Sequence, residues 1–149
     1  MASKLKYLVY VSKESRKLNQ TDLDEILAAS QNYNDANKVS GILLYVEGRF
    51  FQVLEGPSDE VDLLFQTISK DPRHYESTIV AQGDLDKRFF EGWNMRFNKV
   101  SEEEFALLTG VRKFSTWFHV KPKEPNNPAW MFVQKFADKS FPSEGWWQQ

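Results

Sequence analysis

The sequence contains no cysteine and only two histidines, which narrows the chemistry available to it. Disulfide bonds, thiolate metal sites and cysteine nucleophiles are excluded by composition alone. His74 and His119 lie far apart and outside any cluster with metal-ligand spacing. The sequence also lacks a Walker A motif, the glycine pattern of dinucleotide-binding loops and a Gly-x-Ser-x-Gly elbow. A conventional nucleotide-binding enzyme or hydrolase is therefore not expected.

Long apolar runs and an excess of positive charge are lacking as well. No stretch approaches the ~20 apolar residues of a membrane span, and the apolar residues near the N-terminus alternate as in a strand. The net charge of −2 gives no electrostatic footprint for nucleic acid. We therefore expect a cytoplasmic protein that binds neither membrane nor nucleic acid. The length of 149 residues predicts one domain with an appendage.

Apolar periodicity predicts five strands and two helices in the first two thirds of the chain. These are a strand at 5–12, a helix that opens at Thr21 and ends near 32–35, two strands within 40–56 joined by Glu47 and Gly48, a helix that starts at Pro57, and strands at 77–85 and 90–97. The order β-α-β-β-α-β-β predicts an α+β fold with a ferredoxin-like sheet. Right-handed crossovers place both helices on one face of that sheet.

The last third of the chain has a different character. We predict a domain at 1–97 and a C-terminal helical extension at 98–149, with helical patterns at 101–114 and 128–137 around a proline-containing stretch. Four of the five tryptophans lie in this part. Because the second face of the predicted sheet is also apolar, we expect either the extension or a partner subunit to cover it.

Two polar side chains interrupt core-facing positions on the predicted strands. Gln52 shares a strand face with Phe50 and Leu54, and Tyr10 shares one with Leu8. A buried amide without a hydrogen-bond partner costs about 1–3 kcal/mol, so Gln52 needs a partner. If both faces point toward the helices, the phenol and the amide lie within hydrogen-bond reach of each other.

The same face is expected to form a slot between the two helices. Ile26 and Ile68 would face each other across it, and the segment 71–74 would place a cation at its mouth. A planar heterocycle with imide-like edges fits such a slot. Taken singly, these residues are ordinary, since a strand tyrosine is usually a packing residue, and Ser30 and Asn34 suit a helix surface. The pattern alone therefore predicts a small α/β binding module without naming its ligand.

Five segments acquire a more specific meaning together. They are LVYVS (8–12), SQNYN (30–34), SGILLYVEGRFFQVLEG (40–56), KDPRH (70–74) and FEGWNM (90–95). Their order and spacing resemble the BLUF family of flavin-binding blue-light sensors, over residues 5–97. The resemblance implies a non-covalently bound flavin, FAD in the first place, with FMN or riboflavin as alternatives. The chain departs from the family pattern at Tyr33, Thr67 and Phe89.

The resemblance implies a role for each matching residue. Tyr10 matches the photoactive tyrosine, which gives an electron and a proton to the excited flavin, and Gln52 matches the glutamine between that tyrosine and the flavin. The residues that match those binding or sandwiching the ring are Ile26, Ser30, Asn34, Ile68, Asp71, Arg73 and His74. Trp93 and Met95 match residues around the glutamine.

The implied function is a blue-light photoreceptor without substrate turnover. Light would rearrange the hydrogen bonds of Gln52, and the last strand, with Trp93 and Met95, would pass the change to the extension. A short BLUF protein of this kind would signal through a homo-oligomer or an unidentified protein partner.

Two alternatives stay open. One is a flavin-free interaction module with the same fold, suggested by the aromatic extension. The other is a small acylphosphatase-like hydrolase, suggested by the basic loop at 12–17 beside a helix N-terminus.

Overall fold

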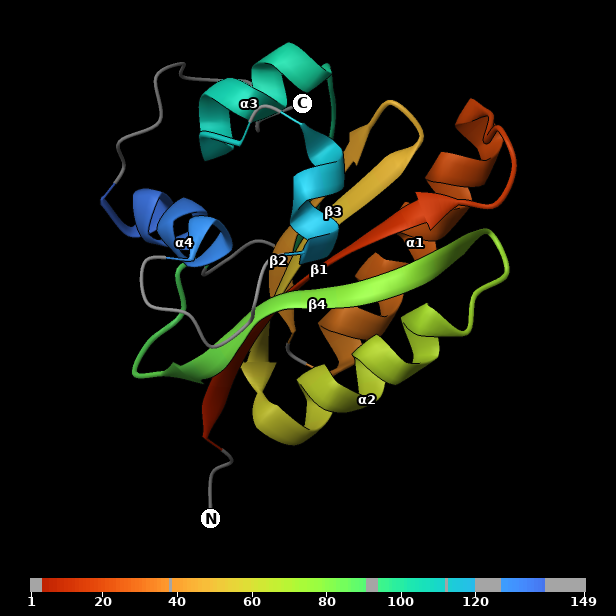
Figure 1. Cartoon of the computed structure of the whole chain (residues 1–149). Helices are drawn as coiled ribbons and strands as arrows, with labels where there is room; N and C mark the ends of the chain where they lie inside the picture. The colour runs from red at the N-terminus through yellow and green to blue at the C-terminus, as the bar shows by residue number, and fades with distance from the viewer. Residues whose placement is uncertain (1–3, 38, 91–93, 112, 120–126, 139–149) are drawn as a thin grey trace.

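The computed structural model describes residues 4–37, 39–90, 94–111, 113–119 and 127–138. A five-stranded sheet lies between two layers of helices (Figure 1). The elements are β1 (Leu5–Glu14), α1 (Gln20–Asn37), β2 (Ser40–Val46), β3 (Arg49–Pro57), α2 (Ser58–Ser69), β4 (His74–Leu85), β5 (Asn94–Val100), α3 (Glu102–Thr109), the short 3₁₀ helix η1 (Phe114–His119) and α4 (Pro128–Asp138). None of the described helices is long and apolar enough to span a membrane.

The strand order is β4-β1-β3-β2-β5, which confirms the predicted ferredoxin-like arrangement. β1 pairs antiparallel with both β3 and β4, and β2 pairs antiparallel with β3. The fifth strand, which follows the fourth in the sequence, lies at the opposite edge of the sheet and runs parallel to β2. Between Leu85 and Asn94 the chain therefore passes from one edge of the sheet to the other.

The hairpin between β2 and β3 forms where the sequence predicts it. Glu47 and Gly48 have φ values of 46° and 87°, the left-handed conformation that a tight two-residue turn requires. This turn pairs Val46 with Arg49 and fixes the register of both strands. Leu43 consequently lies directly opposite Gln52.

Thr21, which the sequence pattern predicts to open and cap the first helix, is not its cap: Asn19, two residues earlier, caps it, and the helix begins at Gln20. The Oδ1 of Asn19 accepts the backbone N–H of Asp22 at 2.9 Å, and the Asp22 carboxylate accepts the N–H of Asn19 at 3.1 Å. This reciprocal pairing satisfies the first turn of α1, which begins at Gln20. The helix also runs past the predicted end, to Asn37.

Each face of the sheet carries its own apolar core. The face under α1 and α2 buries Leu8, Leu54, Val61 and Leu64, among others. The second face packs against α3, η1 and α4, which we call the extension, and buries the apolar residues Tyr7, Val9, Val11, Phe51, Val53, Phe105, Trp117, Phe132 and Val133. The chain's own extension thus covers this face. The division into domains at residue 97 stays a prediction.

One carboxylate is buried on the extension side of β3. Glu55 accepts the backbone N–H groups of Phe89 at 2.8 Å and Phe90 at 2.6 Å, and the hydroxyl of Ser40 at 3.0 Å. Arg88 donates to the Ser40 hydroxyl and to the Glu55 carbonyl. Burial raises the pKa of Glu55, and these hydrogen bonds oppose the rise only in part. Glu55 therefore ties the segment after β4 to the middle of the sheet.

We expect Glu55→Gln to lower the free energy of unfolding by about 1–3 kcal/mol at neutral pH, because the amide NH₂ cannot accept a backbone N–H. Urea denaturation measures the loss. Glu103→Gln, an exposed change of the same kind, is the control and is expected to cost less than about 0.5 kcal/mol.

Wild type and Glu55→Gln together also test the raised pKa of Glu55. Because Glu55 binds its proton more tightly in the folded state, its contribution to stability falls as pH rises above about 4.3, the ordinary value for glutamate. Lowering the pH toward that value should therefore increase the difference in the free energy of unfolding between wild type and Glu55→Gln. A difference that decreases over this range would contradict the raised pKa of Glu55.

Candidate functional site

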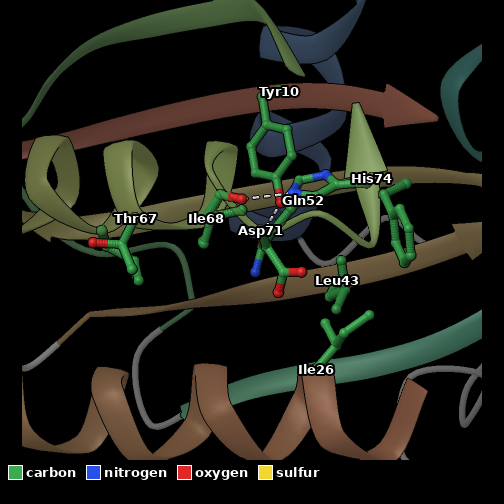
Figure 2. A pocket seen from close by; sticks show the side chains of 10 residues that line it. Tyr10, Ile26, Leu43, Gln52, Thr67, Ile68, Asp71 and His74 are labelled. Carbon is green, nitrogen blue, oxygen red and sulfur yellow. Dashed lines mark hydrogen bonds between the residues drawn. The ribbon is translucent and has the colours of Figure 1, made fainter. Parts of the chain in front are cut away.

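A cavity of about 210 Å³ lies between the two helices and the sheet. Its walls come from β1, β2, β3, α1, α2 and the segment up to the start of β4 (Figure 2). Its lining residues are Tyr10, Ile26, Leu43, Phe50, Gln52, Leu64, Thr67, Ile68, Asp71 and His74. Most of the surface is apolar, and the few polar groups converge from different elements, as is typical of a small-molecule site.

The most buried polar pair of the cavity is Tyr10 and Gln52. They lie directly opposite each other on β1 and β3, and only 2% and 1% of their surfaces are exposed. The Tyr10 phenol donates a hydrogen bond to the Oε1 of Gln52. This contact matches the arrangement that the sequence predicts for the two side chains.

Burial strongly raises the pKa of the Tyr10 phenol, and the negative charge of Asp71 raises it further. The neutral phenol is therefore favoured over the phenolate in this position. Removing an electron from a buried neutral phenol leaves a buried positive charge unless the proton leaves as well. The amide oxygen of Gln52 is the acceptor that this proton already faces.

His74 closes one end of the cavity and is buried. Its Nε2 lies 2.6 Å from the carbonyl of Ile68, which can only accept, so Nε2 carries a hydrogen. Its Nδ1 lies 2.7 Å from the hydroxyl of Ser12. These two contacts hold the imidazole between β1 and the last turn of α2.

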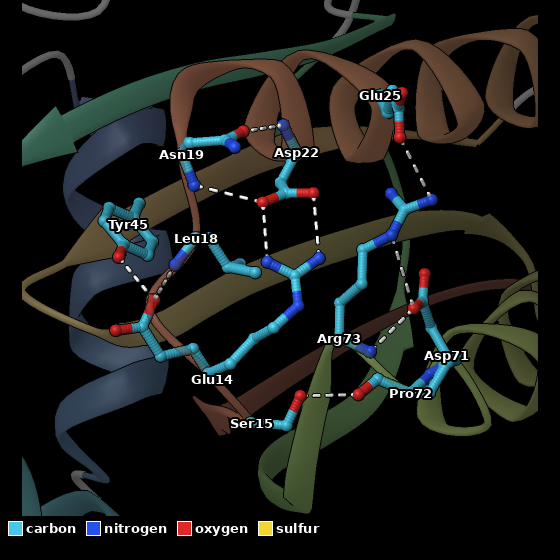
Figure 3. Close-up of polar contacts among 11 residues, drawn as sticks. Glu14, Ser15, Leu18, Asn19, Asp22, Glu25, Tyr45, Asp71, Pro72 and Arg73 are labelled. Carbon is cyan, nitrogen blue, oxygen red and sulfur yellow. Dashed lines mark hydrogen bonds and ion pairs between the residues drawn. The ribbon is translucent and has the colours of Figure 1, made fainter.

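Charged groups surround Asp71, one of the residues that line the cavity (Figure 3). The guanidinium of Arg73 lies 3.5 Å from the Glu25 carboxylate and 3.8 Å from that of Asp71. Asp71 also accepts the backbone N–H of Arg73 at 2.9 Å, which fixes the turn before β4. Arg73 therefore lies next to the lining residue Asp71, and two carboxylates counter its charge. Its role as the cation at the mouth stays a prediction.

A second charged pair, Arg16 and Asp22, joins the loop after β1 to the first turn of α1 (Figure 3). Arg16 forms two parallel hydrogen bonds with Asp22, at 2.9 and 3.0 Å. Together with the backbone N–H of Asn19, these bonds lower the pKa of Asp22 to about 2. The basic loop at 12–17 thus already holds an anionic partner from the chain itself.

The structure brings together many, though not all, of the residues singled out from the sequence. Six of them line the cavity: Tyr10, Ile26, Gln52, Ile68, Asp71 and His74. Arg73 lies next to it through Asp71. Ser30 and Asn34 belong to α1 and Met95 to β5, but their side chains are outside the described ones, as is the whole of Trp93.

Sequence reasoning missed Leu43, Phe50, Leu64 and Thr67 as lining residues, and Ser12 as the partner of His74. A signal existed for Leu43, because the two-residue turn at Glu47 and Gly48 places it opposite Gln52. Signals existed for Phe50 too, because it shares the strand face of Gln52, and for Thr67, because it is one of the departures from the family pattern. Leu64 carried no distinguishing signal, because apolar side chains on a helix usually only pack.

The residues present suit a planar ring with hydrogen-bonding edges, such as the ring system of a flavin. Ile26 and Ile68 approach from the two helices and Leu43 from the sheet, which gives flat aliphatic walls. The amide of Gln52 uses its oxygen for Tyr10, and its other end carries two donor hydrogens. The volume lies below the ~300–1,000 Å³ of pockets that enclose whole ligands, so the cavity suits a ring system rather than an entire dinucleotide.

Comparisons with known proteins point the same way. The family model of BLUF, described as sensors of blue light using FAD, matches residues 5–96. The photoactivated adenylate cyclase subunit beta of Euglena longa is 31% identical over 134 residues, which cover 85% of this chain and 16% of that protein. The blue light- and temperature-regulated antirepressor BluF of Escherichia coli (strain K12) is 40% identical over 148 residues, which cover 81% of this chain and 36% of that protein.

A solved structure resembles most of the described fold. The dark-state structure of the BLUF protein BlrB superposes with a TM-score of 0.69 and 30% identity, over 93% of this chain and 99% of that one. The chain therefore spans nearly the whole of this short protein but only 16% and 36% of the two relatives above.

We expect Ser12→Ala to lower the free energy of unfolding by about 1–3 kcal/mol, because it removes the hydroxyl that faces the buried Nδ1 of His74. Ser15→Ala is the matched control. Its hydroxyl donates to the Pro72 carbonyl at an exposed position, so we expect a cost within about 0.5 kcal/mol. Equal losses in the two variants, measured by chemical denaturation, would contradict the assigned role of Ser12.

Proposed function

Because this chain belongs to the BLUF family of sensors of blue light using FAD, we propose that its cavity binds a flavin ring and that light rearranges the Tyr10–Gln52 hydrogen bond. The observation that carries this proposal is the phenol–amide pair buried in an otherwise apolar cavity. Burying a phenol and an amide costs desolvation free energy, whereas packed apolar side chains would fill the same space without that cost. The pair therefore indicates a functional role.

The binding residues follow from the cavity and from the resemblance. Ile26 and Ile68 would sandwich the ring, with Asp71 and His74 at its ends. Arg73 at the mouth and two residues of α1, Ser30 and Asn34, complete the proposed set. FAD is the flavin that the family's description names. FMN and riboflavin would present the same ring to the cavity and remain candidates.

When bound, the flavin would supply the absorption of blue light and the oxidising power that draws an electron from Tyr10. Tyr10 would give the electron to the ring first and its phenolic proton second, by way of the Gln52 oxygen that this proton faces, because a buried phenol cannot keep the positive charge that remains. Both would return when the original charges are restored, so no net oxidation persists. During the interval Gln52 has lost the hydrogen bond that fixed it, and its amide can rotate or tautomerise.

The energy involved suits a switch. Rearranging one buried hydrogen bond changes a free energy by about 1 kcal/mol, and this shifts an equilibrium between two conformations roughly fivefold. The altered amide would also strengthen a hydrogen bond to the ring edge. We therefore expect a small red shift of the absorption that reverses in darkness.

We further propose that the output is a change in contacts with another protein or another copy of this chain, without turnover of a substrate. The similar proteins from Euglena and E. coli are named as a photoactivated cyclase subunit and as an antirepressor, and both are much longer than the matched region. A relay through Trp93 and Met95, and a cytoplasmic location, stay predictions from the sequence.

The alternatives gain less support. An acylphosphatase-like site would need free donors in the loop at 12–17, but Arg16 and the start of α1 already bind Asp22. A flavin-free interaction module would not require the cavity or the buried hydrogen bond between Tyr10 and Gln52.

Tyr10→Phe should retain the flavin and lose the light-induced red shift, because the ring stays while the transferable proton is removed. The absorption spectrum before and after blue light measures both properties in one sample. Tyr45→Phe is the matched control, since this strand phenol is also buried but donates to Glu14 at 2.6 Å and does not line the cavity.

The control should keep both the flavin and the shift. A Tyr10→Phe protein that still shifts normally would overturn the proposed mechanism. Loss of the shift in both variants would show that any buried phenol on the sheet has the same effect, which would contradict a specific role for Tyr10.

A further inference from the structure

Phe51 connects β3 to all three helical elements of the extension. Its ring is fully buried on the second face of the sheet. It meets the ring of Phe105 in α3 at a centroid distance of 5.1 Å, that of Trp117 in η1 at 5.0 Å and that of Phe132 in α4 at 5.2 Å. Interplanar angles of 69–78° make all three contacts edge-to-face. One side chain of β3 thus contacts every helical element of the extension.

Phe51 is followed in the sequence by Gln52, whose hydrogen bonds change in the proposed function. Successive residues of a strand point to opposite faces, so Gln52 enters the cavity and Phe51 enters the extension core from adjacent positions. β3 is the middle strand, and its pairing with β1 and β2 shows no register shift. Because the register of this strand is fixed on both sides, we expect a change in the hydrogen bonds of Gln52 to tilt the adjacent side chain of Phe51 rather than to slide the strand.

Trp117 makes the extension core sensitive to such a tilt. Its ring is fully buried, yet its indole N–H has no hydrogen-bond partner within the part of the chain that the structure describes. Ring packing against Phe51 and Phe105 therefore positions this side chain, without a hydrogen bond to oppose a shift. Packed aromatic clusters of this kind move between discrete arrangements rather than deforming gradually.

We propose that Phe51 couples the state of Gln52 to the extension, so that light acting in the cavity loosens the packing of α3, η1 and α4 through the central strand. This coupling presupposes the proposed function of the cavity. It differs from a relay along β5, which pairs with β2 and is separated from β3 by that strand. Phe51 is a positioning residue in this scheme, because it lies on the opposite side of the sheet from the cavity.

The test compares backbone hydrogen exchange of the flavin-loaded full chain in darkness and under blue light, with the absorption spectrum recorded on the same samples. In wild type, exchange across 102–109 and 128–138 should become faster in the light, by about threefold or more. In Phe51→Leu the red shift should persist, while this light-dependent increase should largely disappear.

Phe114→Leu is the matched control. Phe114 is buried in the same core and its ring contacts Phe105 at 5.4 Å and Phe118 at 6.0 Å. The guanidinium of Arg49, at the start of β3, lies 5.4 Å from the centre of its ring, and no ring contact joins it to Phe51 among the described residues. The same number of atoms is removed from the extension core, so a general loosening would affect both variants alike. We expect the control to keep the light-dependent increase.

Phe132→Leu provides an independent test if Phe51→Leu does not fold, because it leaves β3 unchanged. It should reduce the light-dependent increase across 128–138 more than that across 102–109. Equal increases in wild type and Phe51→Leu, or no increase in wild type despite a red shift, would overturn the coupling alone. A flavin-loaded wild type without any red shift would overturn the proposed function and the coupling with it.

Discussion

A single buried hydrogen bond, from the phenol of Tyr10 to the amide oxygen of Gln52, is the interaction on which the rest of the site depends. It exists because β1 and β3 pair in a register that sets the two residues directly opposite each other. The register of β3 is held on its other side by the tight turn at Glu47 and Gly48. Slippage by one residue would turn Gln52 to the other face of the sheet and abolish the site.

The two faces of the sheet have different environments: one borders a cavity, and the other packs into an apolar core. On one side, α1 and α2 stand far enough apart to leave a space that a flat ring fits. On the other side, Phe105, Trp117 and Phe132 of the extension pack against Phe51. β3 contributes alternate residues to both sides, so a change in one environment has a short path to the other. This alternation is what the proposed coupling between the cavity and the extension relies on.

The sequence predicted the order of the elements because strand alternation, helical periodicity and a glycine turn are local patterns. The Tyr10–Gln52 contact could be predicted because the ferredoxin-like order sets β1 beside β3, and alternation puts both side chains on the helix face of the sheet. Sequence reasoning misplaced the cap of α1, since Asn19 and Thr21 are both acceptable caps and only the pairing with Asp22 decides between them. It could not place β5 at the far edge or pair His74 with Ser12, because both depend on contacts between segments distant in the chain.

The light-minus-dark absorption spectrum of the purified wild-type protein tests the central claim most directly. We predict a flavin spectrum whose bands move slightly to the red under blue light and return in darkness, because Gln52 changes its hydrogen bonds while the flavin stays bound. A protein that binds flavin without this reversible shift would contradict the claim that Tyr10 and Gln52 form a light-driven switch. A protein that takes up no flavin, even when it is supplied, would contradict the assignment of the cavity as well.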